Sequence, residues 1–314
     1  MREICLSVVL AYILDLILGD PAWLPHPVRG IGYLAKKLEP SLRKSIRNQR
    51  TAGIIFAVVI IGLGFLAVFA IIHLAGYFNR YLGLAFSTFF IYTSLAVKGL
   101  NVESTRVYEA LKINDMGLAR KNLSLIVGRD TENLGPQEII RATVETVAEN
   151  ITDAIIAPIF YAFLGGAALT LAYKAANTLD SMVGYKNEKY KDFGWCSARI
   201  DDCLNFIPAR VSGLIMPLAV SLLGLNALSS FRVVLRDGEK NPSPNSGIPE
   251  AAIAGALGVR LGGLNYYGSV IEMKPFIGDD LNTLSLMHIK KSISIAYVSA
   301  LLSITLGVAL IYIL

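Results

Sequence analysis

A stripe of acidic residues and one arginine recurs at three- and four-residue spacing: Glu138, Arg141, Glu145, Glu149 and Asp153. At 3.6 residues per turn, this spacing places all five on one face of a helix. Acids four residues apart repel each other by about 0.2–0.5 kcal/mol, so a metal ion, an ammonium group or arginines must compensate. A solvated helix face is the alternative. The apolar run after Asp153 argues against it, because acids beside a membrane segment are usually functional or paired.

A second acidic group lies in residues 177–210, where Asp180, Asp201 and Asp202 stand among asparagine, arginine, aromatic and glycine residues. Carboxylate oxygens near phosphate suit Mg²⁺, which keeps several waters and uses one or two carboxylates. Asp201 and Asp202 are adjacent, so on a helix they diverge by about 100° and need not bind one ion together. A polar loop with internal salt bridges is the alternative interpretation.

Residues 18–32, LGDPAWLPHPVRGIG, form a proline-rich segment that offers Asp20, His26 and Arg29 as polar groups. Prolines restrict the backbone, so the pattern predicts a rigid, extended path through this segment. A rigid loop that presents polar side chains beside a membrane segment suits binding. A purely structural connection is the alternative.

Residues 241–263, NPSPNSGIPEAAIAGALGVRLGG, are rich in glycine and alanine. Glycines let backbone N–H groups approach an anion, and Arg260 adds a fork-shaped partner for phosphate. The segment contains no GxxxxGK[ST] pattern, so it offers no P-loop. Close helix packing explains the small residues equally well.

The composition favours a membrane protein as the setting for these groups. Of the 314 residues, 54% are hydrophobic and 17% are charged, with a mean hydropathy of +0.54. Soluble domains are about 45–50% apolar and about 25% charged. The net charge of +5 is mild, and no basic stripe with interleaved aromatic residues indicates nucleic-acid binding.

Apolar runs predict an all-α, polytopic integral membrane protein with a single membrane-embedded domain over residues 1–314. The expected spans are about 4–18, 53–76, 82–97 and 293–314, with two broken segments that span or re-enter the membrane at 154–172 and 206–228. Lysines and arginines between residues 19 and 52 place that loop in the cytoplasm. Leu34, Leu38, Leu42 and Ile46 repeat there every four residues, which predicts a basic amphipathic helix, interrupted at Pro40, on the membrane surface or packed on the protein.

A simple crossing by residues 154–172 would put residues 173–205 outside the cell. That segment carries an excess of lysine and arginine, which is the wrong bias for an external loop. Broken helices at membrane depth are tolerated where they line a cavity. We therefore expect re-entrant or buried helices here, with the helical polar blocks and the active site on the cytoplasmic face.

Four stretches, in this order, resemble the CobD/CbiB family of cobalamin biosynthesis, the adenosylcobinamide-phosphate synthases. They are DLILGDPAWLPHPVRGIG, GRDTENLGPQEIIRATVETVAENITDAIIAP, NTLDSMVGYKNEKYKDFGWCSARIDDCLNFIPAR and PNSGIPEAAIAGALGVRLGG. The resemblance implies amide formation between the carboxylate of adenosylcobyric acid, a corrinoid, and the amine of aminopropanol or its phosphate. It also implies ATP and Mg²⁺. Whether the amine is phosphorylated, how ATP is bound and the oligomeric state stay open.

Residue chemistry assigns roles within that reaction. Mg²⁺ is expected on Asp180 and on Asp201 or Asp202, while Glu145 and Glu149 receive the ammonium and serve as base. The arginines are expected to clamp phosphates or corrin propionates. The catalytic set is Glu145, Glu149, Asp153 and Asp180, and the expected substrate- or phosphate-binding set is Asp20, His26, Arg29, Arg129, Arg141, Asn177, Arg199, Arg210, Asn245, Ser246, Glu250 and Arg260.

Two other classes of protein compete with the enzyme. A transporter also uses broken helices and acids near the membrane, but it should bury its acids in the middle of a span, and here the acids flank the spans. A membrane sensor without catalysis predicts that alanine at Glu145 or Asp180 is harmless.

Overall fold

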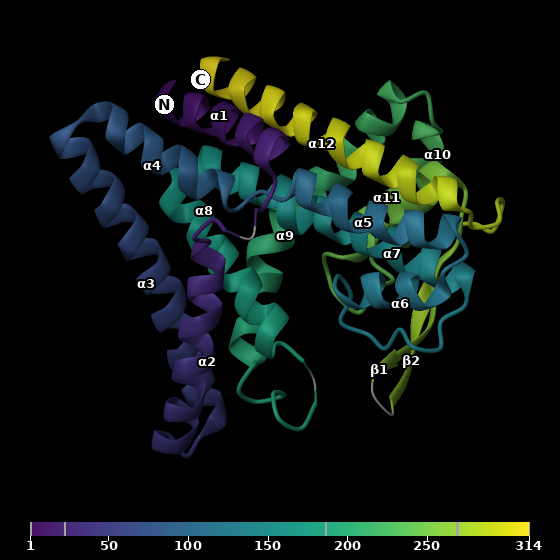
Figure 1. Cartoon of the computed structure of the whole chain (residues 1–314), viewed down its shortest axis with the longest axis horizontal. Coiled ribbons are helices and arrows are strands. Elements are labelled where there is room, and N and C mark those ends of the chain that lie inside the picture. The colour runs from purple at the N-terminus through teal and green to yellow at the C-terminus, as the bar shows by residue number, and fades with distance from the viewer. Residues whose placement is uncertain (1, 22, 186, 268–269, 314) are drawn as a thin grey trace. The chain divides into compact units, whose positions relative to one another are not determined.

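The computed structural model describes residues 2–21, 23–185, 187–267 and 270–313. The described chain is mainly helical and contains one small β-hairpin (Figure 1). The elements are α1 Arg2–Leu18, α2 Pro27–Ser45, α3 Gln49–Phe78, α4 Arg80–Tyr92, α5 Val97–Lys112, α6 Met116–Ser124, α7 Pro136–Ile151, the π-helical turn η1 Thr152–Ile156, α8 Ala157–Val183, α9 Trp195–Leu222, α10 Ala227–Asp237, α11 Gly247–Leu257, β1 Leu261–Tyr267, β2 Val270–Ile277 and α12 Leu286–Ile313.

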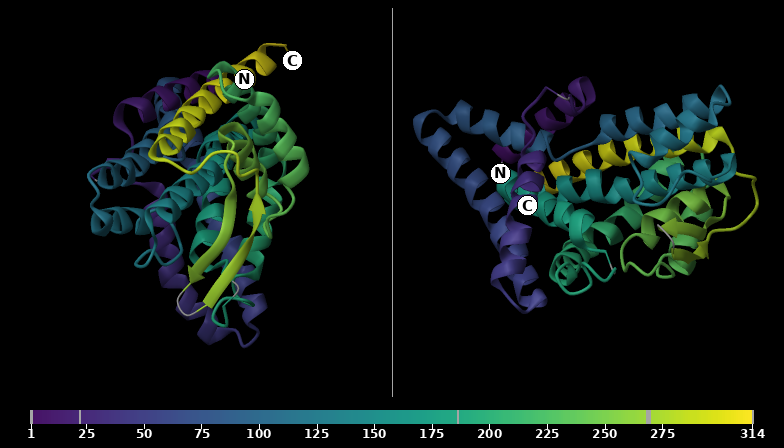
Figure 2. Two further views of the ribbon diagram at one scale, coloured as in Figure 1. Left: turned by 90° about the vertical axis from the view of Figure 1, so that its right-hand side faces the viewer. Right: turned by 60° about the horizontal axis from the view of Figure 1, so that its bottom comes forward.

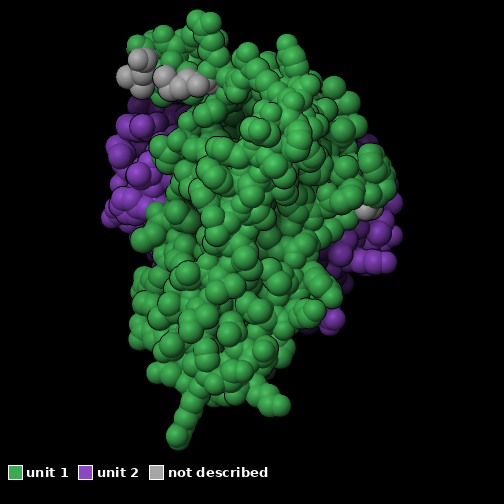
Figure 3. All heavy atoms as spheres, turned by 90° about the vertical axis from the view of Figure 1, so that its left-hand side faces the viewer, with its two compact units in different colours: residues 1–96, 157–205, 304–314 green, residues 97–156, 206–303 purple. Residues whose placement is uncertain are grey.

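The chain divides into two compact units, which Figure 3 distinguishes by colour. Unit 1 comprises residues 1–96, 157–205 and 304–314, and unit 2 comprises residues 97–156 and 206–303. All of the candidate residues on α7 and in the 241–263 segment belong to unit 2. The proline-rich segment and Asp180, Asp201 and Asp202 belong to unit 1.

Within the described residues, five helical stretches are long and apolar enough to cross a membrane, which supports a multi-pass membrane protein. They are Gln49–Phe78, Arg80–Lys112, Pro136–Val183, Trp195–Leu222 and Leu286–Ile313. The expected spans at 53–76 and 82–97 fall within two of them, and the span at 293–314 falls within a third except for residue 314, which lies outside the described residues. The two broken segments largely fall within the others. The first expected span is the 17-residue helix α1, which is not among the five.

Two local expectations for the first 50 residues are wrong. The helix α2 runs through Pro40 without a break, because one missing N–H donor does not end a helix that packs on α3. The proline-rich segment is not extended throughout, because Pro27 begins α2 and Arg29 is helical. Proline suits the first helical position, where its missing N–H would have no partner in the helix.

The core of unit 2 forms around α7, which packs against α5, α6 and α11. From Ile139 onward its side chains are mostly buried, including Val144, Val147 and Ile151. The helix continues into the π-turn η1 where the polar stripe gives way to the apolar run. Asp153 lies in this π-turn, so the single-face geometry predicted for the stripe holds for the four residues from Glu138 to Glu149.

The hairpin β1–β2 was not expected from the sequence (Figure 2, left). Its strands pair antiparallel, with a register irregularity between Leu261 and Gly263. For the Gly/Ala segment, the structure shows the alternative of close helix packing: all of α11 is buried, and a Cβ at Gly255 would lie 2.5 Å from the Ser229 carbonyl oxygen of α10. Small residues at this contact therefore let the two helices approach closely.

Candidate functional site

In unit 2, the stripe on α7 begins with residues that hold the backbone. Glu138 Oε2 accepts a hydrogen bond from the Gly135 N–H at the start of the helix, at 2.7 Å. Arg141 donates from Nη2 to the Leu264 carbonyl at 2.7 Å and from Nη1 to the Gly262 carbonyl. Arg141 thus fastens α7 to the first residues of β1.

Glu145 lies at the centre of a buried ionic cluster. Its carboxylate accepts hydrogen bonds from Arg129 and, at 2.8 Å, from the Gly262 N–H. Arg141 Nε lies 3.8 Å from Glu145 Oε1, and the side chains of Arg129, Arg141 and Glu145 are only 8%, 13% and 5% exposed. The second guanidinium nitrogen of Arg129 donates to Asn265. The protein itself therefore supplies the positive partners that the acidic stripe requires.

Two consecutive glycines make this cluster possible. Gly262 and Gly263 have φ values of 86° and 93°, a region that side chains other than glycine rarely adopt. A Cβ at Gly263 would also lie 2.6 Å from Arg141 Nη1. Glycine in β1 thus provides both the backbone turn and the space for the arginine.

Glu149 lies one turn beyond Glu145, and its environment is more open. Its side chain is 34% exposed and lies 4.0 Å from Lys274 Nζ on β2. The side chain of Glu250 of α11 also lies close to Glu149; it is 2% exposed and accepts a hydrogen bond from Asn241 at 3.0 Å. Of the two α7 glutamates predicted to act as base, Glu149 is therefore the one that a substrate in unit 2 can reach.

A polar cavity of about 380 Å³ opens beside the cluster in unit 2. Arg141 and Arg260 contribute its positive charge, and Phe276 forms an aromatic wall on which Arg260 stacks at 4.6 Å. Arg260 also pairs with Asp280 at 3.0 Å, and both side chains are about half exposed. Glu138 and Asp280 also line the cavity, so it suits an anionic ligand such as a phosphate or a carboxylate when that ligand replaces Asp280 beside Arg260.

The remaining predicted residues of unit 2 form a separate group. Arg210 of α9 donates to Asn245 Oδ1 at 3.0 Å and to the Pro244 carbonyl at 3.2 Å, and it stacks on Phe206. The backbone N–H of Ser246 donates to Ser243 Oγ. Arg210 thus fixes the turn before α11.

In unit 1, the proline-rich segment brings Asp20, His26 and Arg29 together as predicted. Asp20 lies 3.4 Å from Arg29 and 3.9 Å from His26 Nε2, while His26 Nδ1 accepts from the Val28 N–H at the start of α2. Burial lowers the pKa of His26. Asp20 opposes this shift, and the positive charges of Arg29 and Lys174 add to it. His26 is therefore neutral at pH 7 and presents an N–H to Asp20.

Asp201 joins α8 and α9 through an amide network within unit 1. It accepts from Asn177 Nδ2 at 3.2 Å and from Asn205 Nδ2 at 3.0 Å. Asn177 in turn accepts from Lys174 at 3.3 Å, and Asn205 accepts from Tyr173 at 2.9 Å. Both oxygens of Asp201 therefore already have donors, which fixes its orientation.

Asp180 and Asp202 complete the acidic group of unit 1. Both Asp201 and Asp202 lie near enough to Asp180 to act on it electrostatically, and Asp202 lies 3.8 Å from Arg199. Among the described residues, no three His, Cys, Asp or Glu side chains are arranged to enclose a metal ion. Asp180 and Asp202 are two neighbouring carboxylates, and Mg²⁺ uses one or two carboxylates and completes its shell with water and phosphate oxygens.

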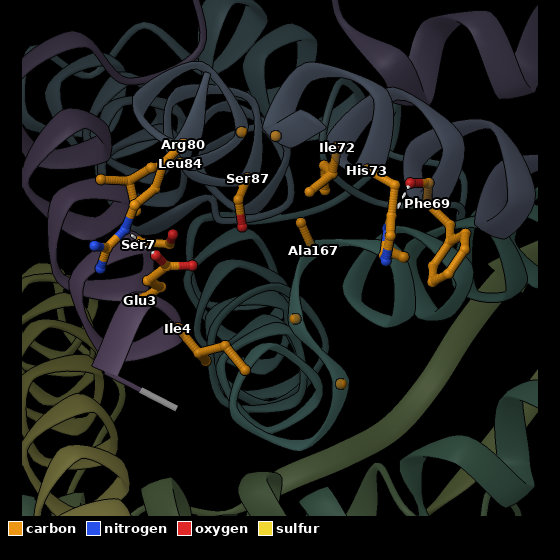
Figure 4. Close-up of a pocket in the computed structure, with 15 residues that line it drawn as sticks. Glu3, Ile4, Ser7, Phe69, Ile72, His73, Arg80, Leu84, Ser87 and Ala167 are labelled. Carbon is orange, nitrogen blue, oxygen red and sulfur yellow. Dashed lines mark hydrogen bonds and ion pairs between the residues drawn. The ribbon is translucent and has the colours of Figure 1, made fainter. Parts of the chain in front are cut away.

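A second cavity, of about 480 Å³, lies in unit 1 among α1, α3, α4 and α8 (Figure 4). Glu3 and Arg80 pair at its edge, and His73 stacks on Phe69 at 4.0 Å. Gly166 of α8 lines this cavity. At a rise of 1.5 Å per residue, Gly166 and Asp180 are about 20 Å apart along α8. This cavity contains none of the predicted site residues.

Comparison with known proteins identifies the family. A model of the family described as CobD/Cbib protein matches residues 8–296.

The chain belongs to the CobD/Cbib family.

Several CobD/Cbib relatives match nearly end to end. A protein named cobalamin biosynthesis protein CobD from Geobacter metallireducens is 47% identical over 314 residues, covering 100% of this chain and 99% of its own. The protein of the same name from Clostridium perfringens is 47% identical and covers 91% of each chain. The one from Klebsiella pneumoniae is 44% identical and covers 96% of each. No solved structure matches the chain.

Several partners in this CobD/Cbib protein were missed by the sequence reasoning. Asn205 follows Asp201 by four residues, a helical spacing that signals the contact. No local pattern connects the others to their partners, which lie nine or more residues away along the chain: Asn241 with Glu250, Asn265 with Arg129, Lys274 with Glu149, and Asp280 with Arg260.

Proposed function

We propose that this protein is a membrane enzyme of cobalamin biosynthesis that forms an amide. It joins the carboxylate of adenosylcobyric acid to the amine of aminopropanol or aminopropanol phosphate, giving adenosylcobinamide or its phosphate. The observation that carries the proposal is the match of all 314 residues to a protein named cobalamin biosynthesis protein CobD. The reaction itself follows from the family resemblance and from the residues described above.

Amide formation needs an activated carboxylate, because a free carboxylate does not react with an amine. In the proposed reaction, a carboxylate oxygen attacks the γ-phosphate of ATP and releases ADP. The amine nitrogen then displaces phosphate from the acyl phosphate, and a base removes the proton that the nitrogen loses. The enzyme must therefore supply an acceptor for the ammonium and donors for anionic oxygens.

Glu149 supplies the base in this proposal. Its carboxylate is partly exposed, whereas that of Glu145 is enclosed by two arginines and the Gly262 N–H. Glu145 then positions α7 against β1, and Glu149 receives the substrate ammonium and takes its proton.

The cavity lined by Arg141 and Arg260 receives an anionic group of a substrate in this proposal. Arg141 has both terminal nitrogens on backbone carbonyls, so it contributes charge at a fixed position. Arg260 is half exposed and pairs only with an exposed acid among the described residues, so it can exchange Asp280 for a phosphate or carboxylate.

Asp180 and Asp202 hold Mg²⁺ in this proposal, and Asp201 is kept in place by its two amide donors. When bound, Mg²⁺ neutralises phosphate charge. Lys174 adds a positive charge on the same turn of α8 as Asn177. We also propose that residues 173–205 face the cytoplasm, since their lysines and arginines follow the bias of cytoplasmic loops.

The test is a reconstituted reaction. Purified protein in detergent receives adenosylcobyric acid, ATP, Mg²⁺ and either aminopropanol or its phosphate, and mass spectrometry detects the amide. We expect product that disappears when ATP or Mg²⁺ is omitted. Folded protein that yields no amide with either amine would refute the proposal.

A matched pair of variants then tests the base. A general base contributes about 10²- to 10⁴-fold, so Glu149→Gln should lower the rate by about that factor. Glu132→Gln is the control, because Glu132 is exposed and lies in the loop before α7. Equal rates in the two variants would remove Glu149 from the mechanism.

A further inference from the structure

Glu250 is a buried acid whose environment does not suit a negative charge. It lies in the first turn of α11, a helix with every residue buried, and is itself 2% exposed. Asn241 donates to its Oε2 at 3.0 Å. Within the described part of the chain, its Oε1 is buried and accepts no hydrogen bond. An ionised carboxylate with one oxygen unsatisfied in such a place is strongly disfavoured.

The charged groups that face Glu250 are mainly negative. Glu149 and Glu145 approach from α7, and Lys274 approaches from β2, where it also lies 4.0 Å from Glu149. On α10, which also packs on α11, Arg236 and Asp237 pair with each other. Burial raises the pKa of Glu250 well above its usual range, the carboxylates of Glu149 and Glu145 raise it further, and Lys274 only partly opposes them.

We infer that Glu250 is a positioning residue that stays protonated and donates a hydrogen bond from Oε1 to the carboxylate of Glu149. The side chains of Glu250 and Glu149 are within hydrogen-bonding reach of each other. If Glu250 and Glu149 were both ionised, both would be hydrogen-bond acceptors, and Glu250 Oε1 would have no donor. With a proton on Oε1, the orphaned atom becomes the donor and both groups are satisfied.

The consequence for the reaction rests on the proposed function. A hydrogen bond from a neutral acid holds the Glu149 carboxylate in one orientation. Glu250 thus acts through Glu149 without touching the substrate. This assignment replaces the expectation, made from sequence, that Glu250 contacts substrate or phosphate.

An infrared spectrum tests the protonation without any substrate. At pH 7 the spectrum of the wild-type protein in detergent minus that of Glu250→Gln should show the C=O stretch of a protonated carboxylic acid. The spectrum of the wild type minus that of Glu132→Gln, a change at an exposed position, should not show it. A wild-type minus Glu250→Gln spectrum without this band would overturn the inference.

The stability of the same variants gives a second readout. An acid whose pKa is raised by folding stabilises the fold below its unfolded pKa, near 4.3, and this contribution is lost as the pH rises through the folded pKa. Glutamine is neutral throughout. The melting temperature of Glu250→Gln relative to wild type should therefore rise with pH, whereas a difference that is constant with pH would contradict a protonated Glu250.

Activity separates positioning from simple packing. Glutamine can still donate to Glu149, so Glu250→Gln should keep the rate within about threefold, since a retained hydrogen bond costs little. Glu250→Leu cannot donate, so its kcat should fall while its KM changes little. A large loss in Glu250→Gln, or an unchanged kcat in a folded Glu250→Leu, would refute the role. The infrared and stability results remain interpretable even if the proposed reaction is wrong.

Discussion

Removal of the Glu145 carboxylate should destabilise unit 2 more than any surface substitution. Glu145→Ala leaves Arg129 with an unpaired nitrogen and leaves the Gly262 N–H without its acceptor. The guanidinium of Arg141 also loses its nearest carboxylate, at 3.8 Å. The side chains of both arginines are at most 13% exposed, so water cannot readily replace Glu145.

The expected magnitude follows from this burial. Breaking a buried ion pair by removing one partner costs about 3–5 kcal/mol, because the other charge stays buried. At about 2–4 °C per kcal/mol for domains of 150–250 residues, the unfolding temperature should fall by about 6–20 °C. Glu145→Gln keeps an acceptor for the Gly262 N–H but loses the charge, so it should cost less, about 1.5–3 kcal/mol.

Thermal unfolding in detergent measures the global effect, and hydrogen exchange measures the local one. The peptide that contains Gly262 should exchange faster in Glu145→Ala, because its N–H loses its acceptor. Glu109→Ala is the control, since the Glu109 side chain is 53% exposed and its pair with Lys112 is on the surface. That substitution should cost about 0–1 kcal/mol. Equal shifts in the two variants, with no change in exchange at Gly262, would refute the buried ionic cluster.

Three further predictions follow from the packing, the charges and the orientation. Gly255→Ala should destabilise the protein by about 1–3 kcal/mol, because the added methyl group overpacks against α10. Gly30→Ala has open space around the added Cβ and should stabilise the protein by up to about 1 kcal/mol. Thermal unfolding of both variants checks this. Burial opposes ionisation of Asp237, but hydrogen bonds from Arg236, Lys240 and the Gly278 N–H hold its pKa well below its usual range. The stability lost in Asp237→Asn should therefore be full at pH 7 and shrink as the pH falls below about 4, and a loss independent of pH would contradict this. Single cysteines placed in residues 173–205 should react with a membrane-impermeant reagent only from the cytoplasmic side, and labelling from outside would contradict the proposed orientation.

The helices were predictable where periodicity and length were strong. The apolar runs at 53–76 and 293–314 correspond to α3 and α12. Proline patterns were less reliable, because Pro27 and Pro40 both lie inside α2. Tertiary packing can maintain a helix that local signals would end.

The candidate site was predictable as residue types but not as partners. Spacing on α7 placed Glu145 and Glu149 one turn apart, and the structure gives these two neighbours very different environments. The difference comes from β1 and β2, which lie more than 100 residues further along the chain. The hairpin was missed because its glycines weaken the alternating pattern of a strand. Without the hairpin, the sequence could not show that the guanidinium groups of Arg129 and Arg141 already have hydrogen-bond partners within the protein.

The most direct test of the proposed chemistry follows the oxygen atoms of the corrinoid carboxylate. Adenosylcobyric acid labelled with ¹⁸O at both oxygens of that group reacts with ATP and the amine, and mass spectrometry locates the label. We expect an amide that retains one labelled oxygen and inorganic phosphate that carries the other. Label in AMP would contradict the acyl phosphate, and labelled acid recovered unchanged beside folded protein would contradict amide formation itself.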